Sequence, residues 1–330
     1  MGNRPVNILL TSGGRRVALL RAFRDALASL GTTGKIICAD AGPLSSAGEA
    51  ADVSELVPRC DDPGYVDCLL ELCRRHEVDL LVPLIDTELA ALAQSRDRFA
   101  EVGTVAVASG PQTIAVSNDK RATETFFRDA QIATPRLVPH ARAVAGDHAF
   151  PLFIKPTNGS SSIGSRVIGD LDELRFYWAR TEDPILLEYL EGVEYTVDVY
   201  VGLDGTVHCA VPRRRIAVRA GEVSKGITED VPTIIEAAML AAGLLPDARG
   251  VLTFQCIMGP SGIPSFFEIN ARFGGGAPLS IHAGADFPRF LIEEVLGQAP
   301  SIPKPPGFDP GVLMLRFDDA VFVPDASSRV

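Results

Sequence analysis

The sequence predicts an α/β domain built on a doubly wound parallel sheet, followed by an α+β region with antiparallel sheets. Three observations predict this. Strand and helix patterns alternate over the first third, strands later flank hairpin turns, and 330 residues are enough for two or three domains. Hydrophobic residues make up 46% and charged residues 22% of the chain, as in ordinary soluble proteins. A chain of this size needs neither disulfides nor a structural metal for stability.

Short apolar strand patterns alternate with amphipathic helix patterns over residues 6–108. The side chains of Leu19, Phe23 and Leu27, for example, follow helical spacing. Strands separated by helices pair in parallel through right-handed crossovers. The sequence therefore predicts a doubly wound parallel sheet that ends near residue 115. Its expected strands are residues 6–10, 36–40, 55–57, 79–84 and 104–108.

The pattern changes after residue 116. A helix at 119–130 is expected to carry Phe126 and Phe127 on its apolar face. Further on, the GLDG sequence at 202–205 is a hairpin turn signal, which indicates antiparallel strands. The proline-rich stretch 299–310 reads as a linker. The other expected elements are strands at 151–156, 165–168, 185–188, 195–201, 206–212, 254–258 and 265–270, helices at 172–180 and 231–243, and one or two strands within 312–323.

Charge and cysteine usage exclude several classes of protein. The chain has 31 Lys and Arg against 42 Asp and Glu, a net charge of −11, which disfavours binding to nucleic acid or anionic lipid. The six cysteines form no CxxC pair, as expected for reduced core residues. No apolar run is long enough to cross a bilayer, and the first residues do not resemble a signal peptide. We therefore expect a cytoplasmic protein with no membrane partner.

The segment SFFEINARFGGG is the strongest candidate for a functional site. If Ser261 and Gly262 form a two-residue turn, Gln255 lies directly opposite Glu268. The period of a strand puts Asn270 on the same face as Glu268. Such an oxygen-rich cluster suits Mg²⁺ that is also bound by phosphates. The alternative is a polar outer face of an edge hairpin.

A second candidate is Lys155, which ends an apolar strand and precedes the loop TNGSSSIGS. Small residues and two glycines allow backbone N–H groups to close over phosphates. The loop matches neither a Walker A sequence nor GxGxxG. The alternative is an ordinary flexible loop.

Acidic and basic residues between these two segments complete the pattern. Glu188 ends an apolar strand, and Glu194 and Asp198 share one face of the next strand. Such acids can hold a ribose hydroxyl or an adenine amino group, although many are simply solvated. The only dense basic stretch contains Arg213, Arg214, Arg215, Arg219 and Lys225, where a phosphate or carboxylate is expected to bind unless part of it is a solvated strand face.

The order of these residues and motifs along nearly the whole chain resembles that of the ATP-grasp superfamily. The segments TSGGRR, PLIDTEL, SNDK, EYTVDV, RAGEVSKG and FFEINARFGGG are similar to the carbamoyl-phosphate-synthase-like and PylC-like carboxylate-amine ligases. The resemblance implies a Rossmann-like pre-ATP-grasp domain at 1–115, a small ATP-grasp lobe at 116–190 and a large C-terminal lobe at 191–330. ATP would lie between the antiparallel sheets of the two lobes.

The resemblance also implies roles for individual residues. The magnesium ligands would be Gln255, Glu268 and Asn270, for two Mg²⁺ ions with Mn²⁺ as an alternative. Arg272, Arg219 and Lys225 would surround the transferred phosphoryl group. The residues that contact ATP would be Lys120, Lys155, Gly159, Ser160, Ser161, Ser162, Gly164, Glu188, Tyr189, Leu190 and Glu194, and those that contact the acceptor substrate would be Arg15, Arg16, Asp86 and Glu88.

The implied reaction starts with attack of a substrate carboxylate on the γ-phosphate, which yields ADP and an acyl phosphate. An amine or ammonia then displaces phosphate and forms an amide. The protein mainly positions the reactants and neutralises charge, and both substrates are small molecules. Homodimers are common in the superfamily. Because the second synthetase half of carbamoyl phosphate synthases is absent from this sequence, production of carbamoyl phosphate by this chain alone is not expected.

Three other functions stay open. The chain could phosphorylate bicarbonate or a carboxylate and pass the product to a partner protein. It could be a non-catalytic ATP-binding sensor, although the retained lysines and metal-site residues argue against this. It could also bind a dinucleotide in its first domain, with Asp40 on a ribose, but TSGGRRV lacks the third glycine of that motif.

Overall fold

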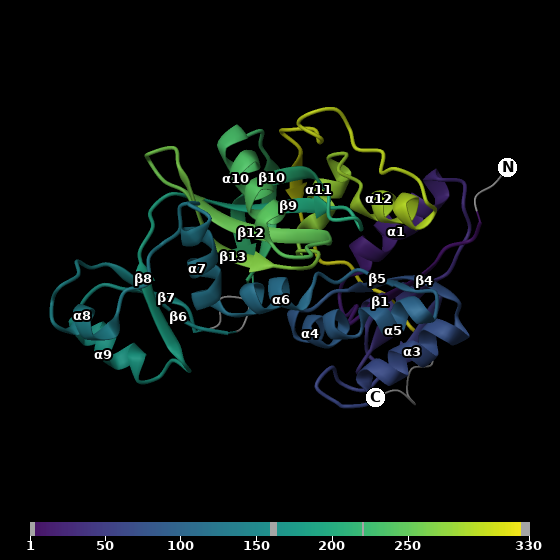
Figure 1. Ribbon diagram of the computed structural model, residues 1–330, viewed down its shortest axis with the longest axis horizontal. Coiled ribbons are helices and arrows are strands. Elements are labelled where there is room, and N and C mark those ends of the chain that lie inside the picture. The colour runs from purple at the N-terminus through teal and green to yellow at the C-terminus, as the bar shows by residue number, and fades with distance from the viewer. Residues whose placement is uncertain (1–3, 159–163, 220, 325–330) are drawn as a thin grey trace.

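The computed structural model describes residues 4–158, 164–219 and 221–324, and its strands form three sheets. In Figure 1 the three-stranded sheet lies at one end of the molecule, the six-stranded sheet in the middle and the five-stranded sheet at the other end. The predicted combination of a parallel N-terminal sheet with later antiparallel sheets is confirmed.

The five-stranded sheet is parallel and has the order β3-β2-β1-β4-β5. The chain therefore moves outward from β1 in both directions, as a doubly wound sheet requires. Strand β5 has two residues where the sequence predicts five. The strands are β1 (Asn7–Thr11), β2 (Ile36–Asp40), β3 (Val53–Leu56), β4 (Val78–Pro83) and β5 (Val105–Ala106), and the helices between them are α1 (Val17–Ser29), α2 (Ser46–Ala50), α3 (Tyr65–Arg75), α4 (Asp86–Gln94) and α5 (Arg96–Glu101).

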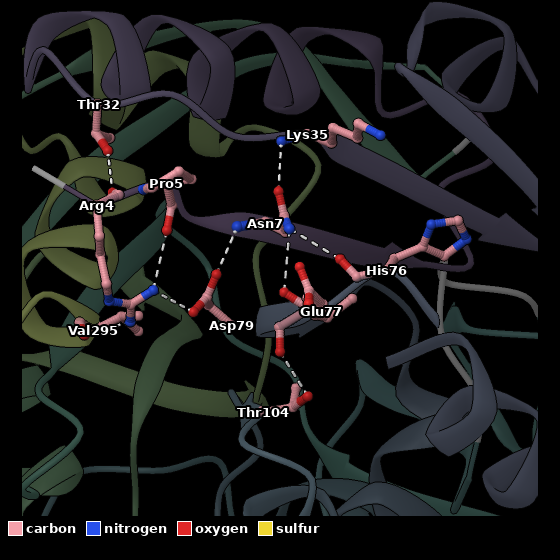
Figure 2. Close-up of polar contacts among 11 residues, drawn as sticks. Arg4, Pro5, Asn7, Thr32, Lys35, His76, Glu77, Asp79, Thr104 and Val295 are labelled. Carbon is pink, nitrogen blue, oxygen red and sulfur yellow. Dashed lines mark hydrogen bonds and ion pairs between the residues drawn. The ribbon is translucent and has the colours of Figure 1, made fainter. Parts of the chain in front are cut away.

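One side chain connects the start of the central strand β1 to both of its neighbours (Figure 2). The Asn7 side-chain oxygen accepts the Lys35 backbone N–H at 2.9 Å. The Asn7 Nδ2 donates to the backbone carbonyls of His76 at 2.9 Å and Glu77 at 3.2 Å. Asp79 Oδ2 in turn accepts the Asn7 backbone N–H at 2.8 Å. These bonds hold the β1 start in register with the chain that leads into β2 and β4.

The six-stranded sheet is antiparallel and has the order β13-β12-β9-β10-β11-β14. Helices α11 and α12 follow its hairpin but were not predicted. Only one short strand, β14, forms at the end of the described chain. The bounds are β9 (Val193–Val201), β10 (Val207–Arg219), β11 (Glu222–Thr228), α10 (Pro232–Leu244), β12 (Gly250–Met258), β13 (Pro264–Asn270), α11 (Ala277–His282), α12 (Phe287–Val295) and β14 (Leu313–Leu315).

The three-stranded antiparallel sheet has the order β7-β6-β8 and its own small apolar core. Val138, Ile154 and Leu174 are among the buried residues of that core. Its strands are β6 (Leu152–Pro156), β7 (Arg166–Ile168) and β8 (Pro184–Glu188), and its helices are α8 (His140–Val144) and α9 (Leu171–Trp178).

Helices α6 (Pro111–Asn118) and α7 (Lys120–Asp129) connect the parallel sheet to the rest of the chain. Phe127 of α7 is fully buried, and its ring centre lies 5.6 Å from that of Phe266 on β13. Phe126 is only partly buried. Although its sequence position falls within the expected small lobe, α7 therefore packs on the six-stranded sheet.

The parallel sheet and the six-stranded sheet share one apolar core. The Phe23 ring of α1 packs edge-on against Phe273 with ring centres 5.9 Å apart, and Phe273 in turn packs against Phe287 of α12. No helix in the described residues is long and apolar enough to span a membrane. The shared core holds the loops of the N-terminal sheet against the β12–β13 hairpin, where the candidate site lies.

Candidate active site

The β12–β13 hairpin brings three oxygen-bearing side chains together. Gln255 lies directly opposite Glu268, as the turn at Ser261 and Gly262 predicts. The Gln255 Nε2 donates to Glu268 Oε1 at 3.1 Å, and the Asn270 Nδ2 donates to the same oxygen at 2.9 Å. This hairpin cluster (Gln255, Glu268 and Asn270) combines one carboxylate with two amides, a donor set that suits Mg²⁺ shared with phosphates.

An arginine connects the hairpin cluster to the N-terminal domain. The Arg272 Nη2 donates to Asp86 Oδ2 at 2.5 Å and to Asn270 Oδ1 at 3.3 Å. Asp86 is the first residue of α4, at the carboxyl edge of the parallel sheet where ligands bind in such folds. The structure therefore brings Asp86 and Arg272, expected to contact acceptor and phosphoryl group respectively, to one place.

A cleft separates the three-stranded sheet from the β12–β13 hairpin, and we call it the lysine cleft. Its floor and walls include apolar side chains such as Phe153, Leu187 and Ile257. Gly164 is outside this lining and has a left-handed backbone with φ of 77°, while the expected contacts Gly159, Ser160, Ser161 and Ser162 lie outside the described residues. The polar residues that line the cleft include Lys120, Lys155, Glu188, Tyr189, Glu194, Gln255 and Glu268, together with the backbone-contact candidate Leu190.

The two lysines of the cleft differ in their access to water, because Lys155 is buried and Lys120 is only partly buried. Lys155 is 5% exposed, and its Nζ donates to the Phe267 carbonyl at 3.4 Å. Burial lowers the pKa of Lys155 to about 8, although nearby Glu268 opposes the shift. Burial also lowers the pKa of Lys120, again against the effect of Glu268. A polyanion in the cleft would favour the charged form of both lysines.

The two expected acidic contacts already have partners. The Glu188 carboxylate accepts the Arg136 backbone N–H at 3.2 Å. The Glu194 Oε1 lies 3.1 Å from Arg215 Nε. Burial is the main cause of the raised pKa of Glu194, and Arg215 works against it. Both carboxylates still line the lysine cleft.

A second cavity, which we call the arginine cavity, lies on the other side of the hairpin cluster. It is lined by basic residues from two domains and also by acids, so it presents both signs of charge. The sequence indicates Arg215 only as one member of the basic run and gives no signal for Glu222, because a run of charges does not show which side chains face inward. The charged residues of the lining are Arg16, Asp86, Arg213, Arg215, Glu222, Glu268 and Arg272.

The glycines of the RFGGG segment leave room for these charged side chains. A Cβ at Gly276 would lie 2.2 Å from Arg213 Nη1, and one at Gly275 would lie 2.8 Å from the Glu222 carboxylate. Non-bonded heavy atoms do not approach each other this closely. A side chain at either position would therefore displace the arginine or the acid. The glycines at these two positions are therefore part of the cavity wall.

Arg213 is held by a buried ion pair. Its Nε and Nη2 donate to the two oxygens of Asp198 at 2.8 and 2.9 Å, and both side chains are fully buried. Ser280 and Thr253 also donate to Asp198, at 2.7 and 3.1 Å. The remaining nitrogen, Arg213 Nη1, has no hydrogen-bond partner in the described part of the chain.

Glu88 lines neither the lysine cleft nor the arginine cavity, which corrects the expectation for this residue. Its side chain is fully buried and accepts the backbone N–H of Leu84 at 2.8 Å and the Tyr65 hydroxyl at 2.5 Å. Ser12 Oγ also donates to it, at 3.0 Å. An acid at the third position of a helix commonly binds the backbone before that helix. Glu88 therefore stabilises the start of α4.

Arg219 and Lys225 are also placed differently from the expectation. Both are exposed, and neither lines the lysine cleft or the arginine cavity. The Arg219 Nη1 instead lies 3.0 Å from Asp318 Oδ2 near the end of the described chain. Arg213 and Arg215 occupy the inward positions of the same basic run.

The consecutive residues Arg15 and Arg16, in the turn after β1, have different surroundings. Arg16 lines the arginine cavity, and burial is the main cause of its lowered pKa, while Glu222 opposes the shift. Arg15 is exposed. The Asp40 Oδ2 accepts the Gly14 backbone N–H at 2.8 Å and the Ser45 hydroxyl at 2.5 Å. Because these bonds use Asp40 to shape the turn, they argue against a dinucleotide site there.

Comparisons with known proteins agree with this geometry. Residues 8–107 match the family model of the PylC-like N-terminal domain, and residues 180–316 match that of an ATP-grasp domain in the biosynthetic pathway with Ter operon. The 3-methyl-D-ornithine–L-lysine ligase of Methanosarcina acetivorans is 26% identical over 269 residues, which are 80% of this chain and 67% of that one. The D-alanine–D-alanine ligase of Nitrosospira multiformis is 28% identical over 240 residues, 61% of this chain and 76% of that one.

Solved structures show the same fold. The biotin carboxylase domain of Hydrogenobacter thermophilus 2-oxoglutarate carboxylase has a TM-score of 0.73 and 16% identity, over 93% of this chain and 73% of that one. The L-amino acid ligase of Bacillus licheniformis has a TM-score of 0.69 and 16% identity, over 92% of this chain and 77% of that one. The chain therefore carries a PylC-like N-terminal domain followed by an ATP-grasp domain, and it is similar over most of its length to ligases that join amino acids.

Proposed function

We propose that this ligase phosphorylates a substrate carboxylate with ATP and couples the acyl phosphate to an amine or ammonia. One observation carries the proposal most directly. Gln255 and Glu268 line both the lysine cleft and the arginine cavity. A phosphate chain in the cleft and an acceptor in the cavity would therefore meet at the hairpin cluster, which is where phosphoryl transfer needs positioned charge.

The lysine cleft has the chemistry that ATP requires. Apolar side chains such as Phe153 and Leu187 suit an adenine ring, and Lys120 and Lys155 suit the phosphates. The donor set of the hairpin cluster fits Mg²⁺, with Glu268 as the carboxylate ligand and Gln255 and Asn270 as amide ligands. Bound Mg²⁺ would neutralise phosphate charge and orient the γ-phosphate.

In the proposed reaction, ATP occupies the lysine cleft and the acceptor occupies the arginine cavity. A carboxylate oxygen of the acceptor attacks the γ-phosphorus, the bond to the β-phosphate oxygen breaks, and ADP leaves. The amine nitrogen then attacks the carbonyl carbon of the acyl phosphate, phosphate leaves, and the amine gives up a proton. Arg272 would hold the transferred phosphoryl group, because its guanidinium already contacts the hairpin cluster through Asn270.

Amino acids are the proposed class of substrate. The two relatives described above are named for ligation of amino acids to one another. The arginine cavity agrees with a zwitterion, because Arg16 and Arg213 can bind a carboxylate while Asp86 and Glu222 can bind an ammonium group.

The test is ADP release by the full chain with MgATP and a panel of amino acids, other carboxylates and bicarbonate, with hydroxylamine present. A hydroxamate formed from one carboxylate would support an acyl phosphate intermediate. ADP release that needs bicarbonate alone and no amine would instead favour transfer of a carboxyl phosphate to a partner. Tight ATP binding without ADP release on any member of the panel would contradict the ligase activity and favour a sensor.

A further inference from the structure

A third cavity adjoins the arginine cavity on the side of the C-terminal strap, residues 316–321. We call it the strap cavity. It is lined by the first turn of α1, by β14 and by the strap. Arg16, Gly274 and Gly275 line both the strap cavity and the arginine cavity. The two cavities therefore adjoin at these residues, and a molecule that occupied both would pass beside them.

The strap cavity has an excess of positive charge. Four arginines line it, and the only acids of its lining are Asp318 and Asp319. Asp318 accepts both of its bonds from Arg219, which is not part of the lining. The second acid, Asp319, makes a longer contact of 3.6 Å with Arg21, and both partners are more than half exposed. The four arginines of the lining are Arg15, Arg16, Arg21 and Arg316.

Arg15 is the arginine of this cavity that has no acid within ion-pair distance among the described residues, although its charge contributes to the lowered pKa of Glu222 after Arg316 and Arg16. It makes no hydrogen bond or ion pair with any other residue that the structure describes. Arg316 differs, because its Nη1 donates to Glu222 Oε2 at 2.9 Å, and Arg16 approaches the other oxygen of Glu222 at 3.9 Å. Glu222 faces the arginine cavity and is not part of the strap cavity lining.

The start of α1 adds backbone donors to the same wall. The helix begins at Val17, has no side-chain cap and carries no acid in its first turn. Val17, Ala18 and Leu19 all line the strap cavity. The first N–H groups of a helix have no acceptor within it and attract anions, an effect that the helix dipole strengthens.

We propose that the strap cavity binds a second anionic group of the acceptor substrate, a carboxylate or a phosphate, which Arg15 and the α1 N-terminus hold together. This rests on the proposed ligase function for the identity of the molecule, since the acceptor reacts in the neighbouring arginine cavity. The apolar side chains of Met314, Leu315 and Pro278 on the same lining suit a hydrocarbon link between the two anionic ends. The substrate class is therefore an amino acid or similar acceptor with an acidic side chain.

The first experiment is direct binding, which does not depend on turnover. Glutarate and inorganic phosphate are titrated into the full chain by isothermal calorimetry, for the wild type, Arg15→Ala, Arg15→Lys and Arg74→Ala. Arg74 is an exposed arginine of the same domain on α3 and serves as the matched control. We expect Arg15→Ala to weaken binding of at least one probe about tenfold. Arg15→Lys should recover part of this loss, and Arg74→Ala should bind like the wild type.

The second experiment compares acceptors in the ADP-release assay. Alanine has one anionic group, and glutamate and O-phosphoserine have two. We expect the ratio of kcat/KM for glutamate or O-phosphoserine to that for alanine to fall about tenfold in Arg15→Ala. Which of the two acceptors is affected distinguishes a carboxylate from a phosphate.

The outcomes separate this inference from the ligase function. If no acceptor supports ADP release, the proposed function fails, and the binding titration alone decides on the anion site. Equal binding of both probes by the wild type and Arg15→Ala, or no binding by the wild type, would overturn the site. A ligase whose ratio of acceptors is unchanged in Arg15→Ala would overturn its role in acceptor binding.

Discussion

Lys155 is a cation in a buried position, and its protonation should be visible in nucleotide binding. Its pKa of about 8 lies below the usual value for lysine because burial disfavours the charged form. The ammonium is therefore present below pH 8 and lost above it. If the lysine binds ATP phosphates, the Kd for MgATP should be constant at neutral pH and rise above about pH 8.

The measurement is MgATP binding to the wild type, Lys155→Arg and Lys304→Arg between pH 6.5 and about 9.5. Arginine stays charged over this range, so Lys155→Arg should move the rise out of the window, whereas Lys304→Arg, at an exposed position, should behave like the wild type. A Kd that does not change with pH in the wild type would contradict contact between the Lys155 ammonium and the phosphates.

The buried pair of Arg213 and Asp198 should be important for stability. Asp198→Asn leaves the guanidinium buried beside a neutral group, and loss of one partner from such a pair costs about 3–5 kcal/mol of the free energy of unfolding. Urea unfolding measures this. The exposed pair Arg59 and Asp61 is the control, and Asp61→Asn should cause no measurable change. Equal effects of the two variants would show that burial does not matter at Asp198.

At the residue scale, the sequence could predict contacts that are determined by local geometry, such as the length of a turn and the period of a strand. The Gln255–Glu268 pair follows from the turn length and strand period alone. The direction in which Glu88 and Arg219 point could not be predicted, because it depends on contacts with Tyr65 and Asp318 from distant parts of the chain. The same holds for the choice of Arg213 and Arg215 from the basic run.

At the scale of elements, the packing of helix α7 on the six-stranded sheet can be tested directly. Phe127 is buried against Phe254 and Phe266 of the six-stranded sheet. Phe127→Ala should lower the free energy of unfolding by about 3–5 kcal/mol, the usual cost of removing a buried aromatic ring. Phe322→Ala, at a side chain that is 89% exposed, is the matched control. A small effect at Phe127 would mean that α7 is not docked on this sheet.

Most strands and long helices could be predicted because their periodicity is strong. Strand β5 is shorter than its apolar pattern suggests, because only Val105 and Ala106 pair with β4. Helices α11 and α12 were missed. Each has a proline near its start, where the residue fits a helix although it often marks a loop.

At the scale of the whole molecule, the arrangement of the sheets explains why the site has residues from distant segments. The parallel sheet and the six-stranded sheet share a core through Phe23 and Phe273, so Arg16 and Asp86 lie against the hairpin cluster. The three-stranded sheet has a separate core and forms the far wall of the lysine cleft. The order of motifs predicts these parts, but their contact surfaces depend on tertiary packing, so the cavity linings come only from the structure.

The central claim is that the hairpin cluster joins the nucleotide cleft to the acceptor cavity in a Mg²⁺-dependent ligase. The measurement that tests it most directly is Mg²⁺-dependent, acceptor-stimulated ADP release by the wild type, Glu268→Gln and Glu71→Gln, with matched unfolding midpoints confirming that all three are folded. Glu71 is an exposed residue of α3 and provides the control. Removal of the Glu268 carboxylate should lower kcat about 100-fold or more, while Glu71→Gln matches the wild type. Wild-type rates in Glu268→Gln would contradict the account.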